Sequence, residues 1–456
     1  MHVVTVETPA LGDRSYLVHD GETGVVVDVQ RDLDRMRQRI DGAGVRVSHV
    51  VETHIHNDYV SGGLPLARAL GAEYVVAADD DVAFDRRPVR DGDTITAGSL
   101  HVTVLATPGH TVHHVGYLVE DGQDDPAVFT GGNLLYGSVG RTDLVDPDLT
   151  DELTRQQYRS ARRLADRLPP QTRVYPTHGF GSFCSSGPAT AKDLSTLAEE
   201  RTSNDALTTD DEDTFVRNLV AGLAAYPSYY AHMGPINRRG GEPADLEPPR
   251  PLDPDDLRQR LEAGQWVVDL RERKAYAAGH ALGSLSFELG DSFTTYVGWV
   301  LPWGEDLVLV GETAGQVAEA QRDLSRIGIG RDVVVGAATG PAEALADGRL
   351  STFPSVGWDE LRQALGDVEE QPVVVDVRRD DEFAEGHIEG AVNLPIHELL
   401  QRLDDAPDGR LWVHCASGYR AAVAASILER AGHAVVHVDD EWEKAPEHGL
   451  PVTSGG

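Results

Sequence analysis

The second half of the chain contains the same α/β unit twice, and this duplication constrains the fold more than any other feature of the sequence. Each copy has a buried-strand run with an aspartate, then a Gly-His pair, then a second apolar run before a loop and a helix. These features lie at 267–271, 279–280 and 307–310 in the first copy and at 373–378, 386–387 and 411–413 in the second. Strands that alternate with helices in this way predict parallel sheets.

Two breaks in this pattern divide the 456 residues into three segments. The stretch 237–254 holds five prolines, which favour an extended linker, and a short junction lies at 348–354. We therefore expect three domains, a number that suits the chain length. Their expected bounds are 1–236, 252–350 and 353–456.

The first segment has the pattern of an α/β domain of its own. Apolar runs of strand length alternate along it with turns and helical stretches. The expected strands lie at 24–29, 47–52, 74–77, 100–107, 115–119 and 128–130, and the expected helices at about 31–42, 64–70 and 151–167.

Histidines recur directly after strands of this first segment. The run THIHND supplies His54, His56 and Asp58 in an H-x-H-x-D pattern, and His110 and His178 follow in TPGHT and YPTHG. Neutral imidazoles suit zinc or iron, and a carboxylate adds negative charge. A single histidine is more often structural, but the recurrence at strand ends predicts a metal site.

Cys415 begins a short loop between a strand and a helix in the third segment. Arg420 stands five positions later, where the helical run AAVAASILERA begins. Backbone N–H groups, the positive end of the helix and the arginine would surround a thiol there and stabilise a bound anion or a persulfide. The pattern predicts a nucleophile that accepts sulfur or phosphoryl groups. The aligned positions of the second segment are Gly311 and Gln316, so we expect no nucleophile there.

The motifs resemble two known families. THIHND, TPGHT, FTGG…GRTDL and YPTHG are similar to the metallo-β-lactamase fold family over about residues 1–230. The third segment resembles rhodanese through DVR, EFAEGHIEGAVNLP and GLPV, and the second resembles it without the cysteine. The resemblance implies an α/β chain: an αββα sandwich followed by two rhodanese-like domains with parallel sheets. The loop from Cys415 to Arg420 is of the sulfurtransferase length, one residue shorter than that of Cys-x5-Arg phosphatases.

GRTDL and HGFGSFC are most similar to persulfide dioxygenases fused to rhodanese domains. That resemblance implies a mononuclear Fe(II), held by two histidines and an aspartate, that oxidises glutathione persulfide with O2. His54 and His110 match the two histidine ligands, and His56 and Asp58 are close enough in sequence to assist. Arg141 in GRTDL is a further candidate for an accessory role.

The sequence departs from the family pattern at two ligand positions. Tyr59 replaces a second-metal ligand, which disfavours a dinuclear hydrolase, and Gly132 replaces the aspartate that binds the metal. A different, weaker or absent metal therefore stays open. His178 and Cys184 are also accessory candidates, since similar fusions carry a cysteine in the same G-S-x-C context.

These observations predict an enzyme of persulfide and sulfide metabolism. A low-molecular-weight persulfide would be oxidised to sulfite in the first segment, and Cys415 would carry sulfane sulfur to an acceptor such as sulfite. Two alternatives stay open. One is a zinc hydrolase of the thioesterase type; the other is a sulfurtransferase whose first segment has lost a competent metal site.

Composition limits the partners. A net charge of -35 excludes a general binder of nucleic acid or of anionic membrane. Two cysteines exclude a disulfide scaffold and favour a reducing compartment. The start is strand-like without a signal pattern, and no apolar run reaches the ~18 residues that span a bilayer. We therefore expect a cytoplasmic protein. The family resemblance implies a persulfide or thiol, O2 and a sulfur acceptor as its partners, and we also expect a homo-oligomer.

Overall fold

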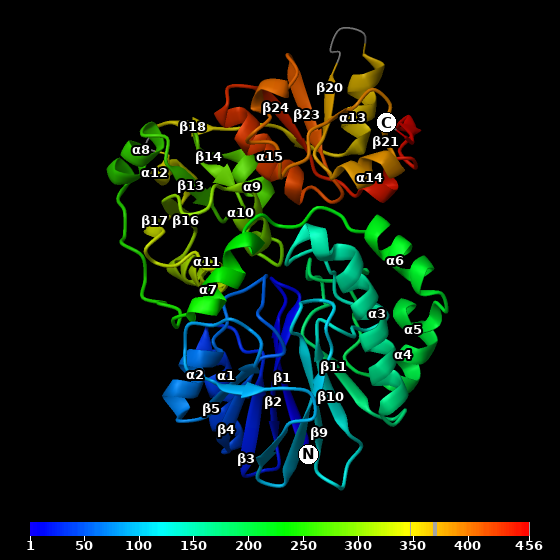
Figure 1. Ribbon diagram of the computed structural model, residues 1–456. Helices are drawn as coiled ribbons and strands as arrows, with labels where there is room; N and C mark the ends of the chain where they lie inside the picture. The colour runs from blue at the N-terminus through cyan, green and yellow to red at the C-terminus, as the bar shows by residue number, and fades with distance from the viewer. Residues whose placement is uncertain (347, 368–371, 456) are drawn as a thin grey trace. The chain divides into compact units, whose positions relative to one another are not determined.

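The structure is a computed structural model that describes residues 1–346, 348–367 and 372–455. The chain forms two compact units (Figure 1). The first comprises Met1–Ala244 with Ser325–Gly328, and the second comprises Asp245–Leu324 with Ile329 to the C-terminus.

The first unit contains two mixed sheets of six strands each. Their hydrogen-bonded orders are β1-β2-β3-β4-β5-β6 and β12-β11-β10-β9-β8-β7. The first sheet comprises β1 (His2–Thr8), β2 (Asp13–His19), β3 (Thr23–Val27), β4 (Arg46–Val51), β5 (Glu73–Ala77) and β6 (Arg87–Val89). The second comprises β7 (Thr94–Ala97), β8 (Leu100–Ala106), β9 (Val115–Glu120), β10 (Ala127–Gly131), β11 (Arg173–Pro176) and β12 (Ser195–Thr196).

Helices cover the outer face of each sheet (Figure 1). A core of valines and aromatic residues, Tyr16 and Phe129 among them, fills the space between the sheets. The expected αββα sandwich is therefore confirmed. The helices are α1 (Leu33–Ala43) and α2 (Gly63–Leu70) on the first sheet and α3 (Thr150–Arg167), α4 (Leu197–Ser203), α5 (Asp205–Thr208) and α6 (Glu212–Ala221) on the second, followed by α7 (Tyr230–Arg239).

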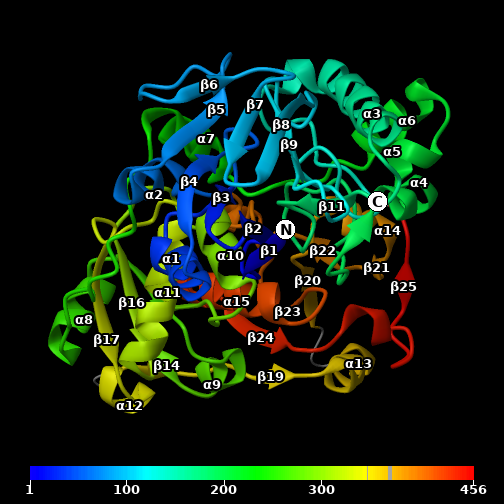
Figure 2. The ribbon, with the colours of Figure 1, turned by 90° about the horizontal axis from the view of Figure 1, so that it is seen from below.

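The second unit contains two parallel sheets, one from each copy of the repeat. Figure 2 shows the first copy in green to yellow and the second in orange to red. The first sheet has the order β15-β13-β16-β17, with β13 (Trp266–Asp269), β15 (Leu285–Ser286), β16 (Leu307–Gly311) and β17 (Val334–Thr339). The second has the order β19-β24-β23-β20-β22, with β19 (Ser355–Val356), β20 (Val373–Asp376), β22 (Val392–Asn393), β23 (Arg410–His414) and β24 (Ala434–Val438).

The helices of the second unit lie around these sheets, and two short strand pairs complete it. The helices are α8 (Pro254–Glu262), α9 (Arg273–Ala278), α10 (Phe293–Val300), α11 (Ala314–Arg326), α12 (Ala342–Leu345), α13 (Trp358–Gly366), α14 (Asp380–Glu385) and α15 (Tyr419–Arg430). The strand pairs are β14 (His280–Ala281) with β18 (Leu350–Ser351) and β21 (His387–Ile388) with β25 (Val452–Thr453).

The Gly-His pair explains why both copies keep the same sequence pattern. In the first copy His280 stacks on Tyr276 at 3.9 Å between ring centroids and its Nδ1 lies 2.9 Å from the Tyr276 carbonyl. In the second, His387 stacks on Phe383 at 3.7 Å and makes the same 2.9 Å contact. Each histidine thus fixes the end of the preceding helix against a short strand pair.

No helix in the described part of the chain combines the length and the apolar character that crossing a bilayer requires.

Helix α7 extends into the stretch at 237–254 that the sequence indicates as linker. Its residue Asn237 is buried, and its side chain donates to the carbonyls of His56 (2.9 Å) and Tyr59 (2.8 Å) and accepts from the N–H of Ser61 (2.8 Å). One amide side chain thus holds the loop that contains the H-x-H-x-D run.

Replacing Asn237 with alanine leaves three buried backbone groups without partners. Since an unpaired buried group costs about 1–3 kcal/mol, we expect Asn237→Ala to lower the apparent free energy of unfolding in urea by about 3 kcal/mol. The matched control Asn218→Ala, on the exposed side of α6, should change it by less than about 0.5 kcal/mol. Equal effects of the two substitutions would contradict this role of Asn237.

Candidate metal centre and candidate thiol site

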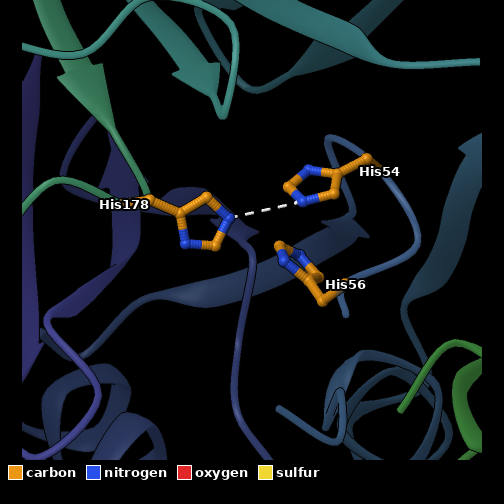
Figure 3. Close-up of side chains that lie close together, drawn as sticks. All are labelled: His54, His56 and His178. Atoms are coloured by element: carbon orange, nitrogen blue, oxygen red, sulfur yellow. Dashed lines mark hydrogen bonds between the residues drawn. The ribbon is translucent and has the colours of Figure 1, made fainter. Parts of the chain in front are cut away.

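Loops that follow parallel strands of both sheets meet at one edge of the first unit, where parallel strands present their carboxyl ends. Three of the expected histidines, His54, His56 and His178, converge there (Figure 3). The centroid of the His54 ring lies 4.1 Å from that of His56, 4.8 Å from that of His110 and 5.3 Å from that of His178. All four rings are buried, so the structure brings the sequence-predicted histidines into one cluster.

Hydrogen bonds at Nδ1 orient the rings of His54 and His110. The Thr53 hydroxyl donates to Asp28 at 2.7 Å, so it accepts from His54 Nδ1 at 2.8 Å. His110 Nδ1 donates to the Arg141 carbonyl at 2.7 Å. Both rings therefore keep the Nε2 lone pair for a ligand, which is the tautomer a metal requires.

The imidazole of His56 is held by carboxylates instead. Its Nε2 lies 3.1 Å from Glu52, 3.3 Å from Asp28 and 3.0 Å from the Tyr59 hydroxyl. Burial alone would lower the pKa of His56, but the two carboxylates raise it to about 9. Tyr59, at the position of the family's additional histidine, therefore supports His56 through a hydrogen bond.

His178 links the cluster to two aspartates. Its Nδ1 lies 2.8 Å from Asp13 and 3.1 Å from Asp58, and its Nε2 lies 3.3 Å from His54 Nε2. Burial opposes protonation, but Asp58 and Asp13 raise the pKa of His178 well above its ordinary value. The thiol of Cys184 is also buried, and its sulfur lies within 4.8 Å of ligand nitrogens of His110 and His178.

Arg141 acts at this site through its backbone. Its carbonyl accepts from His110, whereas its guanidinium pairs with Asp143 at 2.7 Å and lies over the Tyr226 ring at 4.6 Å.

His114, which the sequence motifs did not indicate, is a further member of the cluster. It accepts from the Gly132 N–H at 3.0 Å and its Nδ1 lies 2.8 Å from Thr107. Both of its nitrogens are occupied, so His114 has a structural role.

Asp28 joins the loops of the cluster and was also not anticipated. It follows β3 with a φ of 52°, and among the described residues it is the one non-glycine residue with a left-handed conformation. Its carboxylate accepts from the Thr53 N–H and hydroxyl, both at 2.7 Å, and from the Thr177 hydroxyl. Burial would raise the pKa of Asp28, but His56 and these donors lower it to about 2. The sequence feature that could have indicated a role for Asp28 is its place as an aspartate inside an otherwise apolar strand run.

The donor set fits a metal ion bound mainly by nitrogen. Among the described residues, the buried atoms Asp58 Oδ1 and His56 Nδ1 have no hydrogen-bond partner, and a cation would satisfy such atoms. The family's carboxylate ligand cannot form here, since a Cβ on Gly132 would lie 2.2 Å from the ring of His110. That ring occupies the space an aspartate would need.

The thiol site lies in the second copy of the repeat. Cys415 follows β23 and precedes α15, and it is buried. Gly418 adopts a φ of 87°, and its N–H donates to the Cys415 sulfur at 3.2 Å. A Cβ on Gly418 would lie on the Asp439 carboxylate, so the loop conformation requires glycine.

Arg420 is fixed by a bidentate ion pair with Glu382, at 2.6 and 2.8 Å. Burial would lower the pKa of Arg420, but Glu382 raises it. A cavity of about 860 Å³ opens beside the loop, lined by Ala416, Ser417 and Trp442 among others. Its size suits a small molecule.

The first copy closes the equivalent space with its own chain. The side-chain oxygen of Gln316 accepts from the Glu312 N–H at 2.8 Å, and a Cβ on Gly311 would lie 2.8 Å from it. The Gln316 amide also donates to the Leu270 carbonyl at 2.9 Å. This loop therefore has neither a thiol nor an open anion cradle.

Two protein-family models match separate segments of the chain. The family model of the metallo-beta-lactamase superfamily matches residues 10–178, and that of the rhodanese-like domain matches residues 358–445. The persulfide dioxygenase ETHE1 of Homo sapiens mitochondria is 30% identical over 231 residues, which cover 50% of this chain and 84% of that protein.

A curated hydrolase and a solved structure are also similar to parts of the chain. A hydroxyacylglutathione hydrolase of Methylococcus capsulatus is 33% identical over 184 residues, which are 38% of this chain and 66% of the hydrolase. A metallo-beta-lactamase from Staphylococcus aureus, solved at 2.1 Å, has a TM-score of 0.66 and 28% identity over 74% of this chain and 99% of its own. The chain therefore belongs to the family of the persulfide dioxygenase ETHE1, and it combines a metallo-β-lactamase domain with a rhodanese-like domain.

Proposed function

We propose that the chain oxidises a low-molecular-weight persulfide, of the glutathione persulfide type, to sulfite and transfers sulfane sulfur through Cys415. The observation that carries the proposal is that one chain has both a buried histidine cluster, in which His54 and His110 carry their protons on Nδ1, and a cysteine whose sulfur accepts a hydrogen bond from a loop N–H. The two sites would act on the same sulfur chemistry, since sulfite accepts sulfane sulfur.

In the first unit, we propose His54 and His110 as metal ligands with His178 beside them. A bound Fe(II) would supply the redox chemistry toward O2 and leave open positions for O2 and the substrate sulfur. Thr53 and the Arg141 carbonyl fix the ligand tautomers. The rings are buried, so bulk water is kept away from the proposed metal position and interactions with charged groups there are stronger.

In the second unit, the Cys415 thiolate would attack the terminal sulfur of a persulfide. The sulfur–sulfur bond of the donor breaks, and the donor leaves as a thiolate with the bonding electron pair. Sulfite would then attack the outer sulfur of the Cys415 persulfide to give thiosulfate and restore the thiolate. The Gly418 N–H, 3.2 Å from the sulfur, stabilises the anionic states of this cycle.

Iron-loaded full-length protein should consume O2 and form sulfite when glutathione persulfide is added. Removing the metal with a chelator should abolish O2 consumption and leave thiosulfate sulfurtransferase activity unchanged, because Cys415 needs no metal. An oxygen electrode and a sulfite assay measure the first result. O2 consumption no greater than that of buffer would refute the dioxygenase half of the proposal.

Replacing Cys415 with serine should lower sulfurtransferase activity by about 1000-fold or more, because the nucleophile is lost. The matched control is Cys184→Ser, which removes the other cysteine of the sequence and should keep this activity. The Cys415→Ser variant should still consume O2 with glutathione persulfide. Full sulfurtransferase activity in Cys415→Ser would rule out the proposed carrier.

Hydrolysis of a glutathione thioester with zinc is a second candidate function. The similarity to hydroxyacylglutathione hydrolases favours it. Tyr59 and Gly132 count against a two-zinc version, because neither supplies the ligand that the family pattern has at its position. Thioester turnover by zinc-loaded protein, with no O2 consumption by iron-loaded protein, would favour this alternative.

A further inference from the structure

We propose that Cys184 supplies the anionic metal ligand that Gly132 cannot, so that its thiolate joins His54, His110 and His178 at the metal site of this chain. The inference rests on the metal site proposed above but does not depend on persulfide oxidation. It concerns a residue that lies outside the strand-end positions from which the family's ligands come.

Position 132 has no room for a side chain that could bind the metal. Gly132 donates its N–H to His114, and the His110 ring fills the space of any side chain there. A site built on His54 and His110 alone would have two neutral ligands. A divalent cation needs charge compensation in a buried setting, which neutral ligands do not provide.

The fold brings the thiol of Cys184 next to the histidine cluster. The sulfur of Cys184 and the ligand nitrogens of His110 and His178 all lie within 4.8 Å of one another. The loop of Cys184 is tied to the loop of Gly132, because the Arg141 N–H donates to the Cys184 carbonyl at 2.8 Å and Gly140 forms a bridge with Ser185.

Asp58 gives independent support for a cation at this place. Asp58 is 1% exposed, and its Oδ1 has no hydrogen-bond partner in the portion of the chain described. The carboxylates of Asp58 and Asp13 form a second ligand group with the same His178. A buried carboxylate oxygen without a donor is costly, and a cation bound at His178 would lie next to it.

The chemistry of the set is that of a nitrogen–sulfur site. Thiolate and imidazole bind zinc and iron at about 2.0–2.3 Å, which places the ligand atoms of a tetrahedral site roughly 3.5 Å apart. Since the ligand atoms lie within 4.8 Å of one another, the cluster needs to contract by at most about 1.3 Å to close on an ion. Binding releases the thiol proton to solvent, and the sulfur–metal bond takes its place with no change of oxidation state.

The test uses Co(II) as the metal in full-length Cys415→Ser protein, which keeps Cys184 as its sole cysteine. Stoichiometric Co(II) should give a thiolate-to-metal charge-transfer band in the near ultraviolet. Adding Cys184→Ser should remove the band and weaken Zn(II) binding by more than about 100-fold, since losses of outer contacts alone cost 10–100-fold.

Bound Co(II) without that band would overturn the proposal, as would a band that survives Cys184→Ser. The first result needs no substitution near the site, so it stands even if Cys184→Ser fails to fold. A charge-transfer band together with an absence of O2 consumption would refute the dioxygenase activity and leave the ligand assignment standing. The two failures can therefore be told apart.

Discussion

The buried carboxylate of Asp28 is the interaction on which the histidine cluster depends. It binds Thr53, next to His54, and Thr177, next to His178, so one side chain at the end of β3 sets the distance between two loops from different sheets. Its pKa of about 2 means that it stays ionised at neutral pH. These hydrogen bonds contribute stability above the ordinary aspartate pKa and lose it only as the pH falls toward 2.

The two copies of the repeat show how one architecture either keeps or loses a reactive site. Both retain the ion pair between the strand aspartate and a nearby arginine, Asp269 with Arg271 and Asp376 with Arg378, each at 2.6 Å. That pair holds the strand end whether or not chemistry follows. The difference lies in the loop after the next strand. In the first copy the side chain of Gln316 occupies this loop, whereas in the second copy the Gly418 N–H points at the Cys415 sulfur.

Much of the fold and part of the site could be predicted from local sequence. Strands β3, β4, β5, β8, β9 and β10 and the first three helices of the first unit follow from periodicity, whereas β2, β6, β7, β11 and β12 were not expected. His54, His110 and His178 follow from their places after strands. Helices α4 to α7 were not anticipated, because a mostly polar region has weak periodicity. The roles of Asp28 and Asn237 depend on partners that are distant in sequence, so no local pattern could reveal them.

The proposed chemistry of the first unit depends on a metal bound by its histidine cluster. Anomalous diffraction from crystals of the metal-loaded protein, recorded at the absorption edge of the bound metal, tests it most directly. We expect one strong peak among the ring nitrogens of His54, His110 and His178. Stoichiometric metal in the protein with no peak at these rings would contradict the account.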